Sequence, residues 1–331
     1  MKSKVFIFLF GMCLYYNSMI AQSCIPTWIV FSTQQDIDNF HLNYPSCTEI
    51  EGDVIIKSSP VNSINNLNGL SQLVSVGGLN IDYNTSLNTL SGLENITRIK
   101  GNLLIWDNTS LNSIQALGNL QNVDGFVYIA YNNVLPDLNG LDNLDSIAGH
   151  LEISYNPNMS SIDALQNLNP LTIESTFPST IDLQIYSNPK LSICHLDNIC
   201  QFLNLSDRTT NIINNKTGCE SVEIVRSFCP PPPLCTSLTF PLDSSDNVNI
   251  QTQLSWSPVS DATGYKISIG TSSGETDILD SHDVGNTNSI DSLNLPCGSF
   301  IYVSIIPYND YGDAFNCSEQ LFSTEFTYAG N

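Results

Sequence analysis

The chain has 331 residues, of which 32 are Asp or Glu and only 10 are Lys or Arg, so its formal net charge is −22. A chain this negative repels phosphate backbones and anionic lipid, which argues against nucleic acid and acidic membrane surfaces as partners. An acidic, lysine-poor surface is typical of a protein that must stay soluble outside the cell.

Residues 1–21 are expected to form a signal peptide. Lys2 and Lys4 precede an apolar run over 5–16, and Ala21 lies in a plausible cleavage region. The run is shorter than the roughly 20 apolar residues that a membrane helix needs, and no later stretch approaches that length. We therefore expect a secreted or cell-surface protein with no membrane span after signal cleavage. A first segment retained as an anchor is the alternative.

Of the 10 cysteines, Cys13 lies in this segment, which leaves nine in the mature chain. In an exported chain these predict disulfides rather than a zinc site, and an odd number leaves one thiol over or paired between chains. Cys24 and Cys47 bracket a segment with a short amphipathic helix over about 34–42. We expect this segment to be an N-terminal cap closed by one disulfide.

A repeat of 24 residues follows the cap. Each unit opens on a glycine, carries apolar residues two and four positions later, and from the second unit on has an asparagine seven positions after the glycine. The glycines are Gly52, Gly77, Gly101, Gly125 and Gly149, and the asparagines are Asn84, Asn108, Asn132 and Asn156. A fixed period of this size predicts a solenoid, in which each coil adds one short strand to a growing sheet.

Between the strands, apolar residues recur at every third position, as in Leu111, Ile114 and Leu117. This period suits a coil that turns corners and points one apolar side chain inward per short segment. At a tight corner the asparagine amide can satisfy backbone groups of its own coil and stack on the next. Three tyrosines that precede these asparagines are expected to stack in the same way: Tyr83, Tyr131 and Tyr155.

The next strand, 183–186 with Asn188 after it, comes 32 residues after Leu151 instead of 24. The eight extra residues should bulge out at about 170–180. This bulge is either a loop that contacts a ligand or a tolerated insertion.

The outward face of the strands is the candidate ligand site. Its aromatic and acidic side chains are Trp106, Phe126, Tyr128, Tyr186, Asp82 and Glu152. Exposed aromatic side chains in one patch make good anchors for a partner. The alternative is that these aromatic residues only reflect strand propensity and stack on their neighbours along the sheet.

A C-terminal cap is expected around a helix at about 196–203. Four cysteines lie in it: Cys194, Cys200, Cys219 and Cys229. Three pairings are possible, and we favour Cys194–Cys219 with Cys200–Cys229. His195 beside these cysteines raises zinc as an alternative, which an exported chain disfavours.

The run 47–56 and the Gly-x-Leu-x-Ile coils after it resemble the receptor L domain, over roughly 24–229. The resemblance implies a right-handed, leucine-rich-repeat-like solenoid of the kind that forms ligand-binding lobes of receptor ectodomains and occurs in exported bacterial surface proteins. No kinase or furin-like module follows, so it implies binding architecture and not signalling. We therefore assign 22–229 to this domain.

A proline run forms a stiff linker over 230–234. Beyond it, turn signals bracket short apolar segments, with Trp256 and Tyr265 as expected core aromatic residues. Residues 235–331 are similar to a fibronectin type III domain, and Tyr302 resembles its tyrosine corner. In such a sandwich Cys235 and Cys317 share one pole and should pair, which leaves Cys297 free.

No catalytic constellation emerges. The chain has four histidines and lacks the zinc-protease, serine-hydrolase, P-loop and dinucleotide motifs. The acidic stretch 137–145 does not have the spacing of a calcium loop, and its leucines are explained as inward residues of the repeat. We expect no enzyme activity, no cofactor and no metal.

Together these features predict a mainly β chain: a leucine-rich-repeat-like β-solenoid with disulfide caps, then a fibronectin type III-like sandwich. The function we expect is a non-enzymatic binding or adhesion protein that recognises an extracellular protein or glycan through the strand face. The alternatives are a structural surface-layer or matrix component without a specific ligand, and an accessory module of an exported hydrolase.

Overall fold

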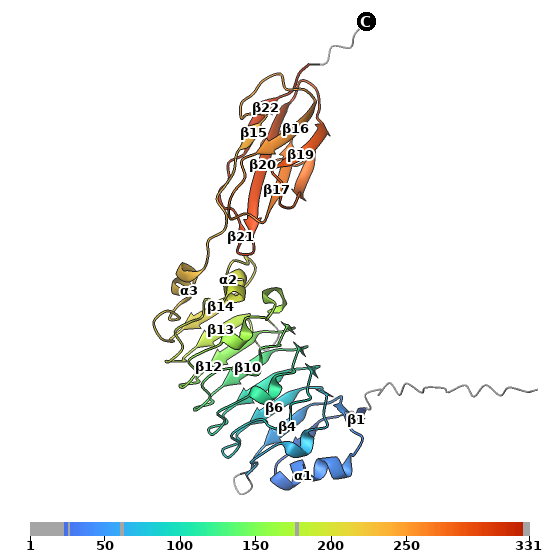
Figure 1. Ribbon diagram of the computed structural model, residues 1–331, viewed down its shortest axis with the longest axis vertical. Coiled ribbons are helices and arrows are strands. Elements are labelled where there is room, and N and C mark those ends of the chain that lie inside the picture. The colour runs from blue at the N-terminus through green and yellow to red at the C-terminus, as the bar shows by residue number, and fades with distance from the viewer. Residues whose placement is uncertain (1–22, 26, 60–62, 176–178, 327–331) are drawn as a thin grey trace, which may run out of the picture.

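The computed structural model describes residues 23–25, 27–59, 63–175 and 179–326, so the expected signal peptide lies outside the described residues. The chain is mainly β and has two parts, which lie end to end along the long axis (Figure 1). We call residues 23–229 the repeat module and residues 235–326 the C-terminal module.

Two parallel sheets run along the repeat module. Each 24-residue coil gives a two-residue strand to one sheet and, after a short turn, a four-residue strand to the other. The larger sheet contains β2 (Ile29–Phe31), β4 (Val54–Lys57), β6 (Leu79–Asp82), β8 (Leu103–Trp106), β10 (Val127–Ala130), β12 (Leu151–Ser154), β13 (Leu183–Tyr186) and β14 (Thr210–Ile213). The smaller sheet contains β1 (Ser23–Ile25), β3 (Glu49–Ile50), β5 (Ser75–Val76), β7 (Arg98–Ile99), β9 (Asn122–Val123) and β11 (Ser146–Ile147).

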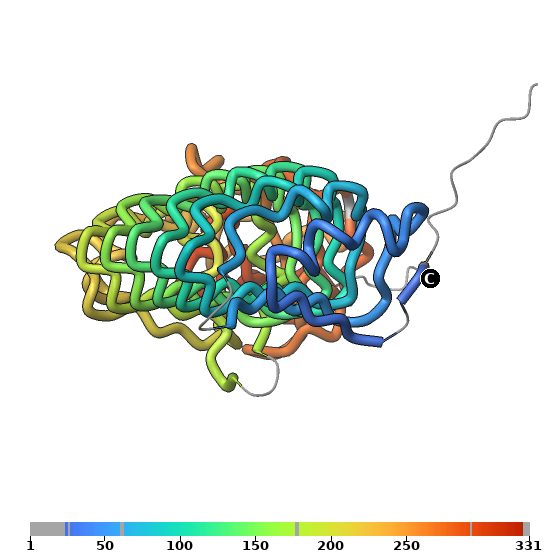
Figure 2. Tube along the Cα trace, turned by 90° about the horizontal axis from the view of Figure 1, so that it is seen from below, coloured from blue at the N-terminus to red at the C-terminus, as the bar shows by residue number. Residues whose placement is uncertain are grey.

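The core runs along the inside of the coils. Ile105, Ile129 and Ile153 are paired in register on neighbouring strands, and all are fully buried. The third-position residues expected to point inward, such as Leu111 and Leu117, are also buried. Seen from below, the coils superpose into a flattened tube (Figure 2). Short 3₁₀ helices turn some of the corners: η1 (Asn68–Leu70), η2 (Gln115–Leu117), η3 (Asp163–Leu165) and η4 (Pro170–Thr172).

The repeated glycines mark a place where successive coils touch through their backbones. A Cβ on Gly77 would lie 2.2 Å from the Glu51 carbonyl oxygen, and one on Gly149 would lie 2.6 Å from the Phe126 nitrogen. Any side chain at these positions would push the coils apart. The 24-residue glycine period is therefore a packing requirement of the stack.

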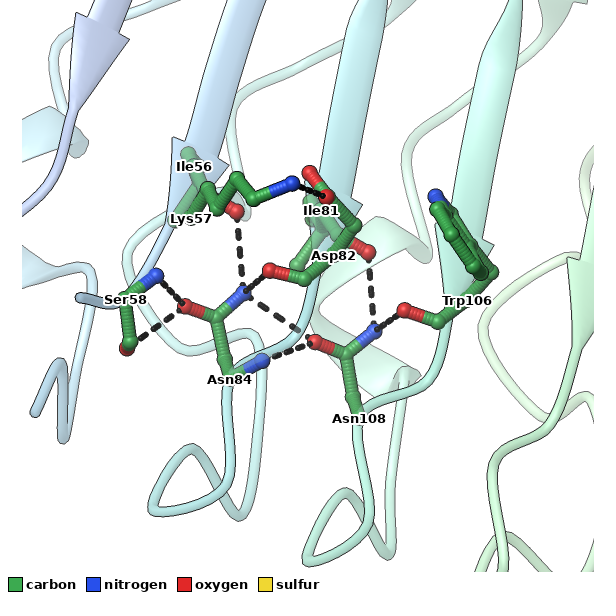
Figure 3. Close-up of polar contacts among 8 residues, drawn as sticks. All are labelled: Ile56, Lys57, Ser58, Ile81, Asp82, Asn84, Trp106 and Asn108. Carbon is green, nitrogen blue, oxygen red and sulfur yellow. Dashed lines mark hydrogen bonds and ion pairs between the residues drawn. The ribbon is translucent and has the colours of Figure 1, made fainter. Parts of the chain in front are cut away.

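The corner asparagines form a buried ladder (Figure 3). The Asn84 side-chain nitrogen donates to the Ile56 carbonyl at 2.9 Å and to the Asn108 side-chain oxygen at 3.0 Å. Asn108 repeats this geometry toward Ile81 and the next rung. Each amide thus satisfies backbone groups that the corner would otherwise leave unpaired. The ladder continues through Asn132, Asn156, Asn188 and Asn215.

Helical segments and disulfides close both ends of the stack. At the N-terminal end, α1 (Gln34–Asn43) begins at Thr33 with a capping box to Asp36, and the Cys24–Cys47 bond joins the flanking segments. At the other end lie α2 (Asp197–Leu203) and α3 (Val222–Phe228). The bonds there are Cys194–Cys219 and Cys200–Cys229, the pairing favoured among the three possibilities.

The C-terminal module has two antiparallel sheets around a separate core that contains Trp256 and Tyr265. One sheet contains β15 (Leu238–Phe240), β16 (Gln251–Trp256) and β19 (Ser289–Asn294). The other contains β17 (Gly264–Gly270), β18 (Leu279–Asp283), β20 (Phe300–Asn309), β21 (Gly312–Asp313) and β22 (Gln320–Ser323). A tyrosine hydroxyl does bond to the backbone here, but it is that of Tyr265, which accepts from the Val259 N–H at 2.8 Å, and not that of the expected Tyr302.

Two cysteines of the C-terminal module, Cys235 and Cys317, are joined in a disulfide. Among the described cysteines, Cys297 is exposed and unpaired. This is the arrangement expected from the sequence.

The two modules touch at the tip of the β20–β21 hairpin, which reaches α2 (Figure 1). There the Tyr311 hydroxyl donates to an Asp197 carboxylate oxygen at 3.3 Å. The Asn204 side chain donates to the Tyr311 carbonyl oxygen. In the same region the Asn309 side chain donates to the carbonyl oxygen of Pro231, which lies in the linker, at 3.4 Å. The contact between the modules is therefore small and polar.

Candidate functional site

The outward face of the larger sheet contains an open hollow of about 330 Å³, which we call the strand-face hollow. It lies over β8, β10, β12 and β13, whose inward residues are held in the core. Its lining residues are Leu104, Phe126, Tyr128, His150, Glu152, Ser179 and Gln184. Strand alternation explains four of these residues, because Leu104, Tyr128, Glu152 and Gln184 each lie between two buried residues of a strand.

Glu152 is the polar centre of the strand-face hollow. One carboxylate oxygen accepts from the Tyr186 hydroxyl and from the Ser154 hydroxyl, each at 2.8 Å. The other accepts from the Gln184 side-chain nitrogen at 3.2 Å. Groups from β12 and β13 thus fix the carboxylate in one orientation, as a binding site requires.

His150 forms one wall of the hollow and stacks on Phe126, with ring centroids 4.5 Å apart and planes 16° from parallel. The imidazole is 4% exposed, and its Nδ1 has no hydrogen-bond partner among the described residues. Burial lowers the pKa of His150 and outweighs the opposing attraction of Glu152 and Asp182, which favours the neutral form of the ring. A buried polar atom without a partner is uncommon, but this nitrogen is enclosed, so the imidazole borders the hollow through the rest of its ring.

Two tyrosines on this face are held in the neutral form. Burial, and then the negative charge of Glu152, raise the pKa of Tyr128 to about 12. Burial and the hydrogen bond to Glu152 also raise the pKa of Tyr186. Both rings therefore keep a hydroxyl and a flat apolar surface at physiological pH, which suits binding and not proton transfer.

The eight-residue insertion reaches the edge of the strand-face hollow. The segment with η4 projects from the stack (Figure 2), and Ser179 beyond it accepts a hydrogen bond from Gln184 at 3.3 Å. Asp182 anchors the insertion, because its carboxylate accepts from the Ser175 N–H and from the Thr209 N–H and hydroxyl. Burial alone would raise the pKa of Asp182, but these hydrogen bonds outweigh burial and hold it below its usual value.

The structure does not gather all six predicted site residues. Phe126, Tyr128 and Glu152 line the hollow, and Tyr186 contacts it through Glu152. Trp106 lies outside the lining and packs edge-on against Tyr83, with centroids 4.5 Å apart. Asp82 is 2% exposed and forms an ion pair with Lys57 at 2.8 Å (Figure 3). The expected aromatic stripe is therefore divided, because Trp106 packs on Tyr83, Phe126 on His150 and Tyr186 on Tyr155.

The hollow also contains residues that the predicted site left out, namely Leu104, His150, Gln184 and Ser179. Strand alternation places Gln184 on this face, and the position after Gly149 places His150 there. Neither residue type by itself indicated a role in ligand binding. Nothing local to Ser179 marks it, since its place depends on the path of the insertion.

Other kinds of site have less support in the part of the chain that the structure describes. There, no group of three or more His, Cys, Asp or Glu side chains is placed to hold a metal ion. The same residues contain no helix that is long and apolar enough to span a bilayer.

A family model described as the receptor L domain matches residues 121–228. The matched segment contains most of the strand-face hollow, the insertion and the C-terminal cap. No curated protein matches the chain. This part of the repeat module is therefore similar to a receptor L domain, which indicates a ligand-binding, receptor-like extracellular module.

Proposed function

We propose that this chain is a secreted or cell-surface binding or adhesion protein, without enzymatic activity, whose ligand occupies the strand-face hollow. In this proposal the repeat module is a right-handed, leucine-rich-repeat-like solenoid that carries the site. The C-terminal module is a fibronectin type III-like sandwich that spaces or docks it. The four disulfides and the acidic composition suit an extracellular setting.

The observation that carries the proposal is the combination of groups in the hollow. The His150 imidazole, a Glu152 carboxylate held by hydrogen bonds and the Tyr128 ring line one open space. A few oriented polar groups in an otherwise apolar concavity are typical of a binding site. The ligand class that fits is an extracellular protein segment or glycan with donors for Glu152 and an apolar surface for Tyr128.

A binding screen with two matched variants tests the proposal. The full-length chain, produced with its disulfides formed, is exposed to immobilised glycans and extracellular proteins. We expect saturable binding that Tyr128→Ala weakens about tenfold or more, because an aromatic anchor is removed. Trp106→Ala is the control, since Trp106 faces outward on the same sheet but lies outside the hollow.

Circular dichroism and thermal melting show whether both variants keep the fold. Binding that both substitutions weaken equally would contradict the assignment to the hollow. If the wild-type chain binds nothing on the panel, a structural surface or matrix role becomes the better proposal.

A further inference from the structure

The carboxylate in the strand-face hollow has no cation beside it. Glu152 is half-buried, and its hydrogen bonds come from neutral groups, namely the Tyr186 and Ser154 hydroxyls and the Gln184 amide. None of the ion pairs between described residues includes Glu152, and no lysine or arginine is among the described residues that line the hollow. A charged group that is partly removed from water is normally balanced by an opposite charge. The charge of Glu152 therefore lacks a partner within the chain.

This negative charge acts on the side chains around it. Burial is the largest cause of the raised pKa of Tyr128, and the charge of Glu152 adds to it. At His150 the charges of Glu152 and Asp182 favour the protonated ring, so they oppose the effect of burial on the pKa. The electrostatic potential in the hollow is therefore negative, and it attracts a cationic group.

Elsewhere on the same sheet, a carboxylate and a tyrosine already hold a cation. The Lys57 ammonium group lies 2.8 Å from a carboxylate oxygen of Asp82 (Figure 3). The same ammonium group lies 4.3 Å from the centroid of the Tyr83 ring, so it also makes a cation–π contact. In the hollow, Glu152 and Tyr128 offer the same two kinds of group. There the cation would have to come from a partner.

The polar atoms that remain free in the hollow are hydrogen-bond acceptors. A carboxylate has about four acceptor sites. Three are taken at Glu152, which leaves one on the oxygen that accepts only from Gln184. The Gln184 side-chain nitrogen donates to Glu152 and to Ser179, while its side-chain oxygen accepts no hydrogen bond from a described residue. Arginine has donors and no acceptor, and its flat guanidinium group stacks on aromatic rings such as those of Tyr128 and Phe126.

We propose that the strand-face hollow binds an arginine side chain of an extracellular protein partner, held between the Glu152 carboxylate and the aromatic rings. The inference rests on the proposed function, which places the ligand in this hollow, and it selects a protein from the two ligand classes named there. A neutral sugar would leave the charge of Glu152 without a partner, and an acidic glycan would be repelled by a chain with a net charge of −22. The hollow, at about 330 Å³, is at the lower end of the range of ligand sites, which suits one long side chain.

Saturation-transfer NMR of the full-length chain with N-acetyl-arginine methylamide, at physiological ionic strength, tests the proposal. We expect saturable binding of this probe. The citrulline analogue, which has nearly the same shape but no charge, should bind about tenfold or more weakly, because a charged hydrogen bond is lost. Glu152→Gln should weaken binding of the arginine probe by a similar factor and remove its advantage over citrulline. Glu51→Gln is the matched control, because Glu51 is exposed and outside the hollow, and the substitution makes the same change in net charge.

The comparison of the two probes on the wild-type chain requires no substitution, so it decides the proposal even if thermal melting shows that Glu152→Gln does not fold. Equal binding of the two probes, or no saturable binding of the arginine probe, would overturn the proposal. Equal losses in Glu152→Gln and Glu51→Gln would do the same, because they would show only the general attraction of an acidic chain for cations.

A second arm separates this inference from the proposed function. Each protein or glycan of the binding panel that the wild-type chain retains is measured again with Glu152→Gln and with the arginine probe as competitor. We expect a retained protein that both treatments weaken. A retained partner that depends on Tyr128 but responds to neither treatment would leave the hollow as the site and overturn the arginine assignment. Absence of both panel binding and arginine binding would overturn both proposals.

Discussion

At the scale of single residues, the corner asparagines show how a side chain replaces missing backbone partners. Each amide donates to carbonyl groups of its own coil and of the preceding coil, and it accepts a hydrogen bond from the preceding coil. Asn132, for example, donates to the Ala130 and Ile105 carbonyls and accepts from the Asn108 N–H. A second series lies on the surface, where Asn119 and Asn143 donate to carbonyls of the preceding coil. Both series use an asparagine side chain, buried in one and exposed in the other. Comparing them therefore separates the effect of the hydrogen bond on stability from the effect of desolvation.

Asn132→Ala tests the buried series. The substitution removes the donor to the Ile105 and Ala130 carbonyls and the acceptor of Asn108, all in a dry environment. We expect the free energy of unfolding of the repeat module to fall by about 3 kcal/mol or more, measured by urea denaturation. The control Asn143→Ala, at the surface, should cost about 1 kcal/mol or less. Equal losses would contradict a role for burial.

The left-handed tyrosines illustrate a second effect at this scale. A non-glycine residue in that conformation costs roughly 1–2 kcal/mol, yet Tyr83, Tyr131 and Tyr155 all adopt it. They were expected to stack, and Tyr131 and Tyr155 do. Tyr83 packs instead on Trp106 and under the Lys57 ammonium group, 4.3 Å from the ring centroid. The difference arises because Asp107 interrupts the tyrosine column in the intervening coil.

At the scale of elements, the insertion between β12 and β13 decides the shape of the strand-face hollow. It leaves the strand register unchanged, since Leu151 still pairs with Leu183 across the 32-residue interval. The extra chain therefore lies beside the sheet, where Ser179 borders the hollow. The Asp182 carboxylate joins Ser175, in the insertion, to Thr209, in the next coil, because it accepts hydrogen bonds from both.

Asp182→Asn tests this anchor. An amide cannot accept with both atoms, so we expect a loss of about 1–3 kcal/mol in the free energy of unfolding at pH 7. Because the folded pKa of Asp182 is depressed, its contribution is complete above the unfolded value of about 3.9 and is lost as the pH falls through the folded value. Urea denaturation from pH 7 to below pH 4 should show wild type and variant converging in acid. A difference that persists unchanged at low pH would contradict the anchor.

At the scale of the whole molecule, two separate cores are joined by a few polar contacts. The buried residues of the repeat module and of the C-terminal module form distinct clusters. The hairpin tip meets α2 through Tyr311 and Asn204. Small polar interfaces between domains seldom fix their orientation alone, so these contacts should govern how the modules are aligned rather than whether they fold.

The double variant Asn204→Ala/Tyr311→Ala tests this alignment. We expect the melting temperatures of both modules to change by less than about 4 °C, because the lost hydrogen bonds are outside both cores. The pair-distance distribution from small-angle X-ray scattering should become broader, as the modules sample more orientations. Asp310→Ala, at the same surface, is the control. A large loss of stability in either module would show instead that the two fold as one unit.

The sequence alone determined the features that repeat along the chain. The 24-residue period, the inward apolar positions and the corner asparagines follow from local pattern, because each coil meets the same packing requirement as its neighbour. One helix in each cap, α1 and α2, was placed to within about one residue at each end, whereas α3 was not predicted. The favoured cysteine pairs are those that the structure joins. Regular structure is predictable when the same physical constraint is applied many times.

Only the tertiary structure decided which outward side chains form a site. Glu152 meets a hydroxyl 34 residues away on Tyr186, and Ser179 borders the hollow because the insertion returns to the sheet beside Gln184. Asp82 and Trp106 face outward by the same alternation, but Asp82 forms an ion pair with Lys57 and Trp106 packs on Tyr83. Alternation fixes the face of a residue, whereas the partner on that face depends on sideways contacts between coils, and the period carries no information about those.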